Sequence, residues 1–296
     1  MVKINNLKTE KTNPKTKDLD LLSTSEILSI MNEEDLNVVA AVKKALPQIE
    51  EVVKACVETI KNKGRVIYIG SGTSGRTGLI DAVECGPTFS CTDEFIGVLS
   101  GGYNAIVKAK EGSEDDEQQA IIDLKEINIS NSDLLIGIAA SGRTPYAISA
   151  MNHIHSIGGK CACIVCNYDS KMAKIADYPI EVDAGPEILT GSTRLKSGTC
   201  QKIICNMIST STMVSLGKVY KNLMIDVRAT NEKLVERCRN IVMEATGCDY
   251  ETANTTLNEV DNNCKLATIM IVTNCSKQEA ISKLEKSDNN LRNALK

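Results

Sequence analysis

The segment RVIYIGSGTSGRTGLIDAVE, residues 65–84, contains three patterns of an α/β protein in succession. Val66–Ile69 is a short apolar run rich in β-branched residues, which predicts a buried strand. SGTSG follows as a glycine-rich turn, and RTGLIDAVE is compatible with a helix. The segment therefore predicts a strand, a tight turn and a helix.

The same plan repeats at Asp133–Ala140. That apolar run leads into the turn Ser141–Thr144, and Pro145 begins a predicted helix that ends at Gly158–Gly159. Proline is favoured in the first turn of a helix, where its missing N–H costs nothing. Later apolar runs predict two more strands and a long buried helix, at residues 161–165, 180–182 and 201–216. This alternation predicts an α/β fold with a mostly parallel sheet covered by helices on both faces.

Helical patterns flank this region. After a polar, lysine-rich arm, residues 25–62 have the spacing of helices, with a break at Pro47. From about Ala229 the pattern changes to short helices, with a stop signal at Gly247 and a capping box at Ser276–Glu279. We expect an N-terminal arm and helices (1–50), the α/β domain (51–228) and a small all-helical C-terminal module (229–296).

The charge balance limits the possible partners. The chain has 34 Lys and Arg against 38 Asp and Glu, a formal net charge of -4, so it lacks the broad basic field that attracts nucleic acid or anionic lipid. The N-terminal sequence has no apolar signal region, and no apolar run approaches the length of a membrane span. We expect a cytoplasmic protein with no nucleic-acid or membrane partner.

Cysteine and histidine give little sign of a metal. The twelve cysteines are scattered, and many lie in apolar runs, which indicates reduced, buried thiols. Cys163 and Cys166 have the spacing of a zinc or redox pair, but they lie in a predicted strand with no second pair. His153 and His155 point in different directions on a helix. We therefore expect no metal site.

The glycine-rich turns predict phosphate binding. Gly70–Gly75 matches the dinucleotide pattern G-x-G-x-x-G and nearly matches a P-loop, but Arg76 stands where a P-loop has lysine. Every position between the glycines is Ser or Thr, which adds hydroxyl donors to a helix N-terminus and suits a monophosphate. Ser74–Thr77 and Ser141–Thr144 both read Ser-Gly-Arg-Thr. Two such turns can meet at one sheet edge and bind a sugar phosphate. The expected binding residues are Ser71, Gly72, Thr73, Ser74, Arg76, Ser141, Gly142, Arg143 and Thr144.

Several longer strings carry a family resemblance. IGSGTSGRTGLIDAVEC, KAKEGSEDD, GIAASGRTPY, TGSTRLKSGT, GKVYKNLMIDVRATNEKLVERCRNIVMEATGC and the N-terminal TEKTNP resemble the bacterial N-acetylmuramic acid 6-phosphate etherases of the sugar isomerase domain family, in order and almost end to end. The resemblance implies a sugar isomerase domain, a homodimer, and a lyase that converts the sugar phosphate to N-acetylglucosamine 6-phosphate and D-lactate without a metal or other cofactor. It also implies two catalytic glutamates, Glu84 and Glu114. Arg194 and Lys196 are expected near anionic groups of the substrate, with a solvated helix start as the alternative.

The predicted positions of the glutamates suggest different roles. Glu84 falls near the predicted end of a helix, and Glu114 falls near the start of one. The C-terminal end of a helix disfavours negative charge, whereas the N-terminal end favours it. We expect Glu84 to act as general acid and Glu114 as general base in an elimination. One departure is that Gly86 stands where the family usually has proline.

Three other functions stay open at this point. A sugar-phosphate sensor on the same fold would keep both turns without needing the glutamates. An aldose–ketose isomerase would bind the same ligand class without releasing lactate. A nucleotide-dependent oxidoreductase would rest on the glycine pattern, but no convincing acidic residue ends the next strand.

Overall fold

The computed structural model describes residues 7–296 and divides into two compact units. The first extends to Val83 and resumes at Asp93–Ser209; the second consists of Glu84–Thr92 and Thr210–Lys296. The domain boundaries expected at residues 50 and 228 stay a prediction. Within the described residues, no helix has the length and apolar character needed to cross a membrane.

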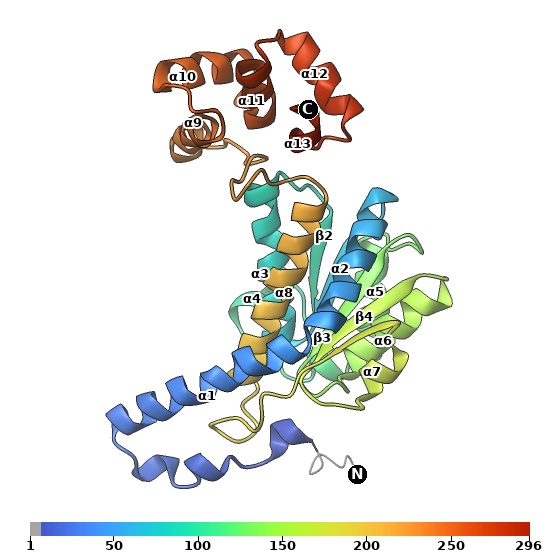
Figure 1. The fold of residues 1–296 in the computed structure, drawn as a ribbon. Coiled ribbons are helices and arrows are strands. Elements are labelled where there is room, and N and C mark those ends of the chain that lie inside the picture. The colour runs from blue at the N-terminus through green and yellow to red at the C-terminus, as the bar shows by residue number, and fades with distance from the viewer. Residues whose placement is uncertain (1–6) are drawn as a thin grey trace. The chain divides into compact units, whose positions relative to one another are not determined.

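The first unit is built on a five-stranded parallel sheet, which confirms the expected α/β fold (Figure 1). The strand order is β2-β1-β3-β4-β5, and β1 pairs with β3 so that Gly70 lies opposite Ile138. The strands are β1 (Val66–Gly70), β2 (Phe95–Leu99), β3 (Leu134–Ala139), β4 (Lys160–Val165) and β5 (Tyr178–Glu181).

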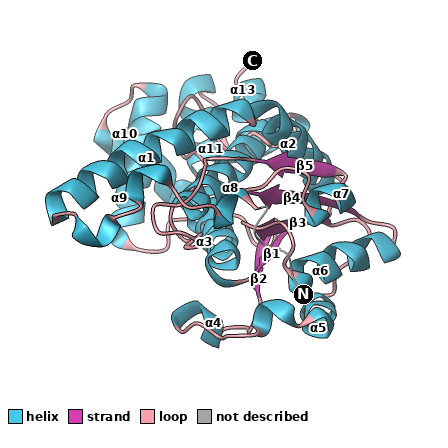
Figure 2. Ribbon diagram, turned by 90° about the horizontal axis from the view of Figure 1, so that it is seen from below, coloured by secondary structure: helices cyan, strands magenta, loops and turns pink. Residues whose placement is uncertain are grey.

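Helices cover both faces of the sheet (Figure 2). On one face Ile67, Leu135 and Cys163 pack in a buried cluster with side chains of α5 (Glu117–Glu126), α6 (Pro145–Ser156) and α7 (Lys171–Ile175). On the other face lie α2 (Leu46–Lys61), α3 (Gly72–Phe89) and α8 (Lys196–Ser215). Tyr68 points to this second face, where its hydroxyl donates to the Cys205 carbonyl at 3.4 Å.

The N-terminal helices follow their sequence signals. Three short 3-10 helices, at Lys8–Glu10, Pro14–Thr16 and Leu19–Leu21, precede α1 (Thr24–Lys44). Ser23 and Glu26 form a capping box at the start of α1. The predicted break is confirmed, because α1 ends before Ala45 and α2 begins with Pro47 in its first turn.

Strand β2 was not expected from the sequence. It contains Gly97, and a glycine in a strand weakens the strand pattern. The structure supplies the reason for this glycine: a Cβ atom there would lie 2.5 Å from the Cα of Leu79 in α3. The tight contact between α3 and β2 therefore requires glycine at position 97, and this glycine weakens the strand pattern in the sequence.

The second unit has its own helical core, as expected for the C-terminal module. Its helices are α9 (Glu232–Thr246), α10 (Tyr250–Glu259), α11 (Cys264–Thr273), α12 (Lys277–Lys286) and α13 (Leu291–Ala294). Gly247 ends α9 with a φ of 79°, and Ser276 and Glu279 form the predicted capping box of α12. Buried side chains from all five helices form one cluster with Leu223, Ile225 and Val227.

Candidate active site

The two Ser-Gly turns lie at the same edge of the sheet. β1 leads into Ser71 and α3, while the neighbouring β3 leads into Ser141–Thr144 and α6. Because α3 and α6 pack on opposite faces, the carboxyl ends of β1 and β3 form the point at which open α/β sheets bind ligands.

The start of α3 is arranged for an anion. The helix begins at Gly72, so the N–H groups of Gly72, Thr73 and Ser74 have no carbonyl partner within the helix. Directly before them, the Ser71 hydroxyl oxygen is buried and makes no hydrogen bond. A buried hydroxyl without a hydrogen-bond partner destabilises the protein unless a ligand supplies that partner. A phosphate oxygen at this helix N-terminus would satisfy both the N–H groups and the hydroxyl.

The glycines of this turn have packing roles of their own. A Cβ at Gly70 would lie 2.6 Å from the Ile138 carbonyl oxygen, and one at Gly75 would lie 2.3 Å from the Gly70 carbonyl oxygen. Gly72 has a φ of 55°, which favours glycine. The glycine pattern thus allows the helix to approach the sheet closely, and this requirement is independent of any nucleotide.

A cavity of about 150 Å³ opens beside the start of α3. Glu114 lies on its wall, in the 3-10 turn η4 (Ser113–Asp115), with its side chain exposed. The structure therefore brings Glu114 together with Ser71, Gly72 and Arg76. The lining residues are Ser71, Gly72, Arg76, Ser100, Ala105, Ala109, Lys110, Glu111, Gly112, Ser113 and Glu114.

Arg76 supports the wall of this cavity. Its Nε and Nη2 donate to the Ala105 carbonyl at 2.9 and 2.6 Å, and Nε also donates to the Ile106 carbonyl at 3.2 Å. Both carbonyls belong to α4 (Asn104–Val107), the helix that begins the loop leading to Glu114. The guanidinium therefore holds α3 to that loop, in addition to placing a positive charge at the cavity.

Ser100, Lys110 and Ser113 are among the lining residues that were not expected from the sequence. The Ser100 and Ser113 hydroxyls lie 3.1 Å apart, and Ser113 also donates to the Lys110 carbonyl at 2.8 Å. These bonds fix the loop before Glu114 to the end of β2. Lys110 and Ser113 lie within the KAKEGSEDD string, so their closeness to Glu114 in the sequence was the available signal.

The second turn lies at the same edge but does not line this cavity. The Ser141 hydroxyl accepts from the Arg143 N–H at 3.4 Å, and Gly142 has a φ of 65°. A Cβ at Gly142 would lie 2.4 Å from the Ser170 side chain. Thr144 precedes α6 without a side-chain cap, so the first N–H groups of α6 are not capped by its hydroxyl.

Arg194 and Lys196 differ in their surroundings. Arg194 is exposed, whereas the Lys196 side chain is 1% exposed and donates to Glu34 Oε2 at 2.7 Å and to the Ala184 carbonyl at 3.0 Å. Lys196 lines a different, larger cavity of about 430 Å³ beside the N-terminal arm. Its charge is thus already paired within the protein.

Glu84 is exposed on α3 and belongs to the second unit. The expected helix end near Glu84 is wrong, because α3 continues through Gly86 and Pro87 to Phe89. The helix dipole acts within the last turn, and Glu84 lies before the last turn of α3, which ends at Phe89. Glu84 also follows Gly72 by twelve residues of the same helix.

Comparisons with known proteins place the chain among sugar isomerase (SIS) domains. The model of the glucokinase regulatory protein N-terminal SIS domain matches residues 48–155, and the SIS domain model matches residues 117–211. The chain is 50% identical over 293 residues to a protein named N-acetylmuramic acid 6-phosphate etherase from Bacillus cereus (strain G9842). It is 49% identical to one of the same name from Bacillus thuringiensis subsp. konkukian (strain 97-27). Each match covers 99% of this chain and 100% of the relative.

Solved structures with the same fold are more distant in sequence. A protein of Escherichia coli CFT073, solved in a ligand complex, has a TM-score of 0.51 at 14% identity, covering 68% of this chain and 97% of that one. Phosphoheptose isomerase from Neisseria gonorrhoeae has a TM-score of 0.50 at 14% identity, covering 64% and 98%. At these identities the likeness shows the fold alone.

Proposed function

The chain belongs to the N-acetylmuramic acid 6-phosphate etherase family, and we propose that it cleaves the D-lactyl ether of N-acetylmuramic acid 6-phosphate with water. The products are N-acetylglucosamine 6-phosphate and D-lactate, and the activity serves amino sugar catabolism and cell-wall sugar recycling in the cytoplasm. The full-length match at 50% identity carries this proposal. The anion site at Ser71 beside Glu114 supports it, because the substrate carries a phosphate and the reaction needs a carboxylate close to the bound sugar.

In the proposed binding mode, the phosphate lies at the start of α3. The N–H groups of Gly72, Thr73 and Ser74 and the Ser71 hydroxyl donate to its oxygens. Lys110, on the wall of the same cavity, adds a cation that can approach the phosphate from solvent. The turn Ser141–Thr144 then contacts the sugar from the end of β3.

The reaction is an elimination followed by addition. In the open-chain sugar the lactyl ether leaves from C3, which is β to the C1 aldehyde. Glu114 removes the C2 proton, the C2–C3 double bond forms, and the C3–O bond breaks as Glu84 gives a proton to the departing lactyl oxygen. Water then adds to C3 of the unsaturated aldehyde while C2 regains a proton. The proposed steps require neither a metal nor a nicotinamide.

The proposed assembly is a homodimer. Both glutamates must reach one sugar, and in a dimer with a shared site one of them comes from a second copy. Mixing Glu84→Gln and Glu114→Gln subunits tests this idea. If each site draws the two glutamates from different copies, mixed dimers regain part of the activity that neither parent has. If the subunits are shown to exchange and the mixed dimers stay inactive, this result would count against a shared site.

The decisive experiment is to incubate the purified chain with N-acetylmuramic acid 6-phosphate and to measure D-lactate. Release of lactate separates the etherase from both a sensor and an aldose–ketose isomerase. Unphosphorylated N-acetylmuramic acid should be a very poor substrate. If folded protein released no lactate, the proposed function would be wrong, and equilibrium titration with NAD would then test the oxidoreductase.

A further inference from the structure

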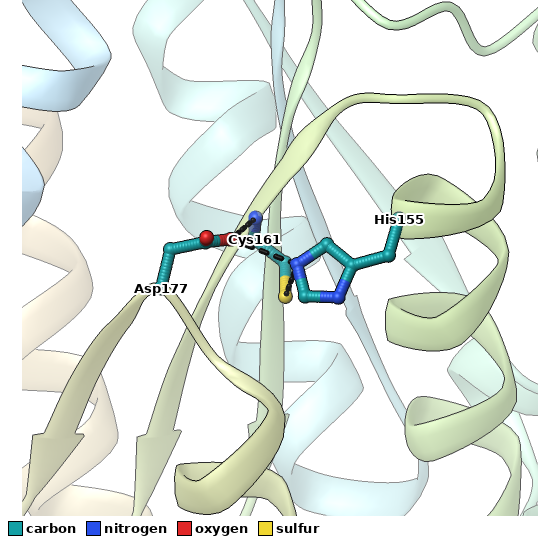
Figure 3. A group of neighbouring side chains, drawn as sticks. All are labelled: His155, Cys161 and Asp177. Carbon is teal, nitrogen blue, oxygen red and sulfur yellow. Dashed lines mark hydrogen bonds and ion pairs between the residues drawn. The ribbon is translucent and has the colours of Figure 1, made fainter.

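Three potential ligand atoms converge at the opposite edge of the sheet from the candidate active site (Figure 3). His155 projects from the last turn of α6, Cys161 is the second residue of β4, and Asp177 directly precedes β5. His155 Nε2 lies 2.8 Å from Asp177 Oδ2 and 3.4 Å from Cys161 Sγ. The nitrogen, sulfur and oxygen atoms all lie within 4.8 Å of one another.

The cluster does not have the geometry of a Cys-His-Asp catalytic triad. In a triad, one imidazole nitrogen faces the nucleophile and the other faces the carboxylate. Here the same atom, Nε2, faces both Cys161 and Asp177. Cys161 is also fully buried, which keeps substrates from its sulfur.

Hydrogen bonding satisfies the Asp177 carboxylate but leaves the Cys161 sulfur with a weaker contact to His155. A neutral imidazole has a single N–H, and its Nε2 can either donate or accept, so it cannot serve the carboxylate and the thiol equally well. A cation at the centre of the three atoms would instead be contacted by all of them. The three elements that supply the ligands then meet at one point.

The ligand set suits zinc. Zn²⁺ binds thiolate, imidazole and carboxylate at about 2.0–2.3 Å, so tetrahedral coordination places sulfur about 3.6 Å and oxygen about 3.4 Å from the nitrogen. The observed nitrogen-to-sulfur distance of 3.4 Å is close to this value, and the nitrogen-to-oxygen distance of 2.8 Å would lengthen by roughly half an ångström. The Cys161 N–H donates to the same Asp177 oxygen at 2.9 Å and orients the carboxylate, as outer contacts do in metal sites.

From this geometry we propose that His155, Cys161 and Asp177 form a binding site for a zinc-type divalent cation, with water as the fourth ligand. The His155 and Asp177 side chains are 34% and 38% exposed, so the ion can enter from solvent. Bound metal connects the end of α6 to the starts of β4 and β5 and stabilises that edge of the sheet. The site lies away from the sugar-phosphate cavity and takes no part in the proposed elimination.

Cobalt titration of the intact, reduced, metal-stripped chain tests the site, because Co²⁺ reports its ligands by absorption. We expect one equivalent of Co²⁺ to produce a sulfur-to-cobalt charge-transfer band and tetrahedral d–d bands, which Zn²⁺ then displaces. Cys161→Ser should abolish the charge-transfer band. His155→Ala and Asp177→Asn should weaken binding by more than the ~10–100-fold typical of outer-contact changes.

Matched controls use the same residue types outside the cluster. His153→Ala and Cys248→Ser should bind Co²⁺ as the parent chain does. If Cys161→Ser does not fold, the partly exposed His155 and Asp177 variants decide the question. Spectra unchanged by the His155 and Asp177 substitutions, or the absence of a stoichiometric tetrahedral cobalt spectrum in the parent chain, would overturn the proposal.

Discussion

Lys196 Nζ lies 2.7 Å from Glu34 Oε2, in a pair whose side chains are 1% and 6% exposed. Glu34 also accepts from Asn13 at 2.9 Å and pairs with Lys15 at 3.1 Å. The pair therefore joins the start of α8 to α1 and to the N-terminal arm. This arrangement gives Lys196 a structural role inside the first unit, whatever its distance from a bound substrate.

Replacing one member of this buried pair should destabilise the protein strongly. Lys196→Met leaves the Glu34 carboxylate buried without its main partner, which typically costs about 3–5 kcal/mol. The double change Glu34→Leu with Lys196→Met removes both charges and should recover much of that loss. Urea unfolding of the single and double variants measures the coupling, with the exposed Arg194→Met as control. Additive losses in the double variant would mean that the two side chains act independently.

The same pair predicts a pH dependence of stability. Burial raises the pKa of Glu34, but hydrogen bonds from Lys196 and Lys15 outweigh it and lower the pKa from 4.5 to about 2. Since the folded pKa is depressed, the stabilisation is complete above about pH 4.5 and is lost as the pH falls toward 2. The difference in unfolding free energy between the parent chain and Glu34→Gln should shrink across this window. A difference that stays constant down to the acid limit would contradict the assignment.

Much of the fold could be predicted because the signals are local. Val66–Gly70 and Leu134–Ala139 are buried on both faces, so they read as unbroken apolar runs. The helix break at Pro47 and the helix end at Gly247 could be predicted because they depend on the backbone properties of proline and glycine alone. The end of α3 was missed because Gly86 and Pro87 are local helix breakers, yet both lie inside the helix.

The site was less predictable because its contacts come from distant segments. Arg76 was expected to face the ligand, and its bonds to Ala105 and Ile106 depend on where α4 lies. Lys196 pairs with a residue 162 positions away. The sequence indicates that these residues are charged and lie near turns, but the choice between a ligand and a protein partner is made by tertiary packing.

Ser71→Ala should separate binding from stability. The Ser71 hydroxyl is buried and has no hydrogen-bond partner within the protein, so its removal should leave the unfolding free energy unchanged or slightly raised. Loss of a hydrogen bond to phosphate should weaken substrate binding by about 1–3 kcal/mol, seen as a higher KM with a similar kcat. Thr77→Val is a suitable control, because that hydroxyl already donates to the Thr73 carbonyl at 2.9 Å. Equal effects of both variants on KM would remove Ser71 from the phosphate site.

Arg76→Lys should act mainly on kcat. Lysine cannot reproduce the guanidinium bonds to the Ala105 and Ile106 carbonyls, so the loop that carries Glu114 should shift. A displacement of about 1 Å can cost ~10²-fold in rate. Arg65→Lys is the matched control, since Arg65 pairs with Asp133 at 2.8 Å at the opposite end of β1. That variant should lose stability and keep its kcat, whereas a rise in KM alone for Arg76→Lys would point to direct phosphate binding.

The roles of Glu84 and Glu114 can be separated by isotope exchange in deuterated water. If Glu114 removes the C2 proton and Glu84 protonates the leaving lactyl oxygen, Glu84→Gln should release almost no lactate while still exchanging the C2 proton with solvent. Glu114→Gln should lose both activities. Each loss of lactate release should be at least the ~10²–10⁴-fold typical of removing a general acid or base. Lactate is measured enzymatically, and deuterium at C2 by NMR of the recovered substrate.

The comparison of the two variants also tests the assignment itself. Exchange that survives in Glu114→Gln but not in Glu84→Gln would reverse the two roles, because the carboxylate that removes the C2 proton is the one whose loss stops exchange. Near-normal lactate release in both variants would make the two exposed glutamates ordinary surface residues of α3 and η4. Loss of exchange in both variants would mean that departure of lactate is concerted with proton removal. In that case Glu84 and Glu114 act in one transition state, and substitution cannot uncouple them.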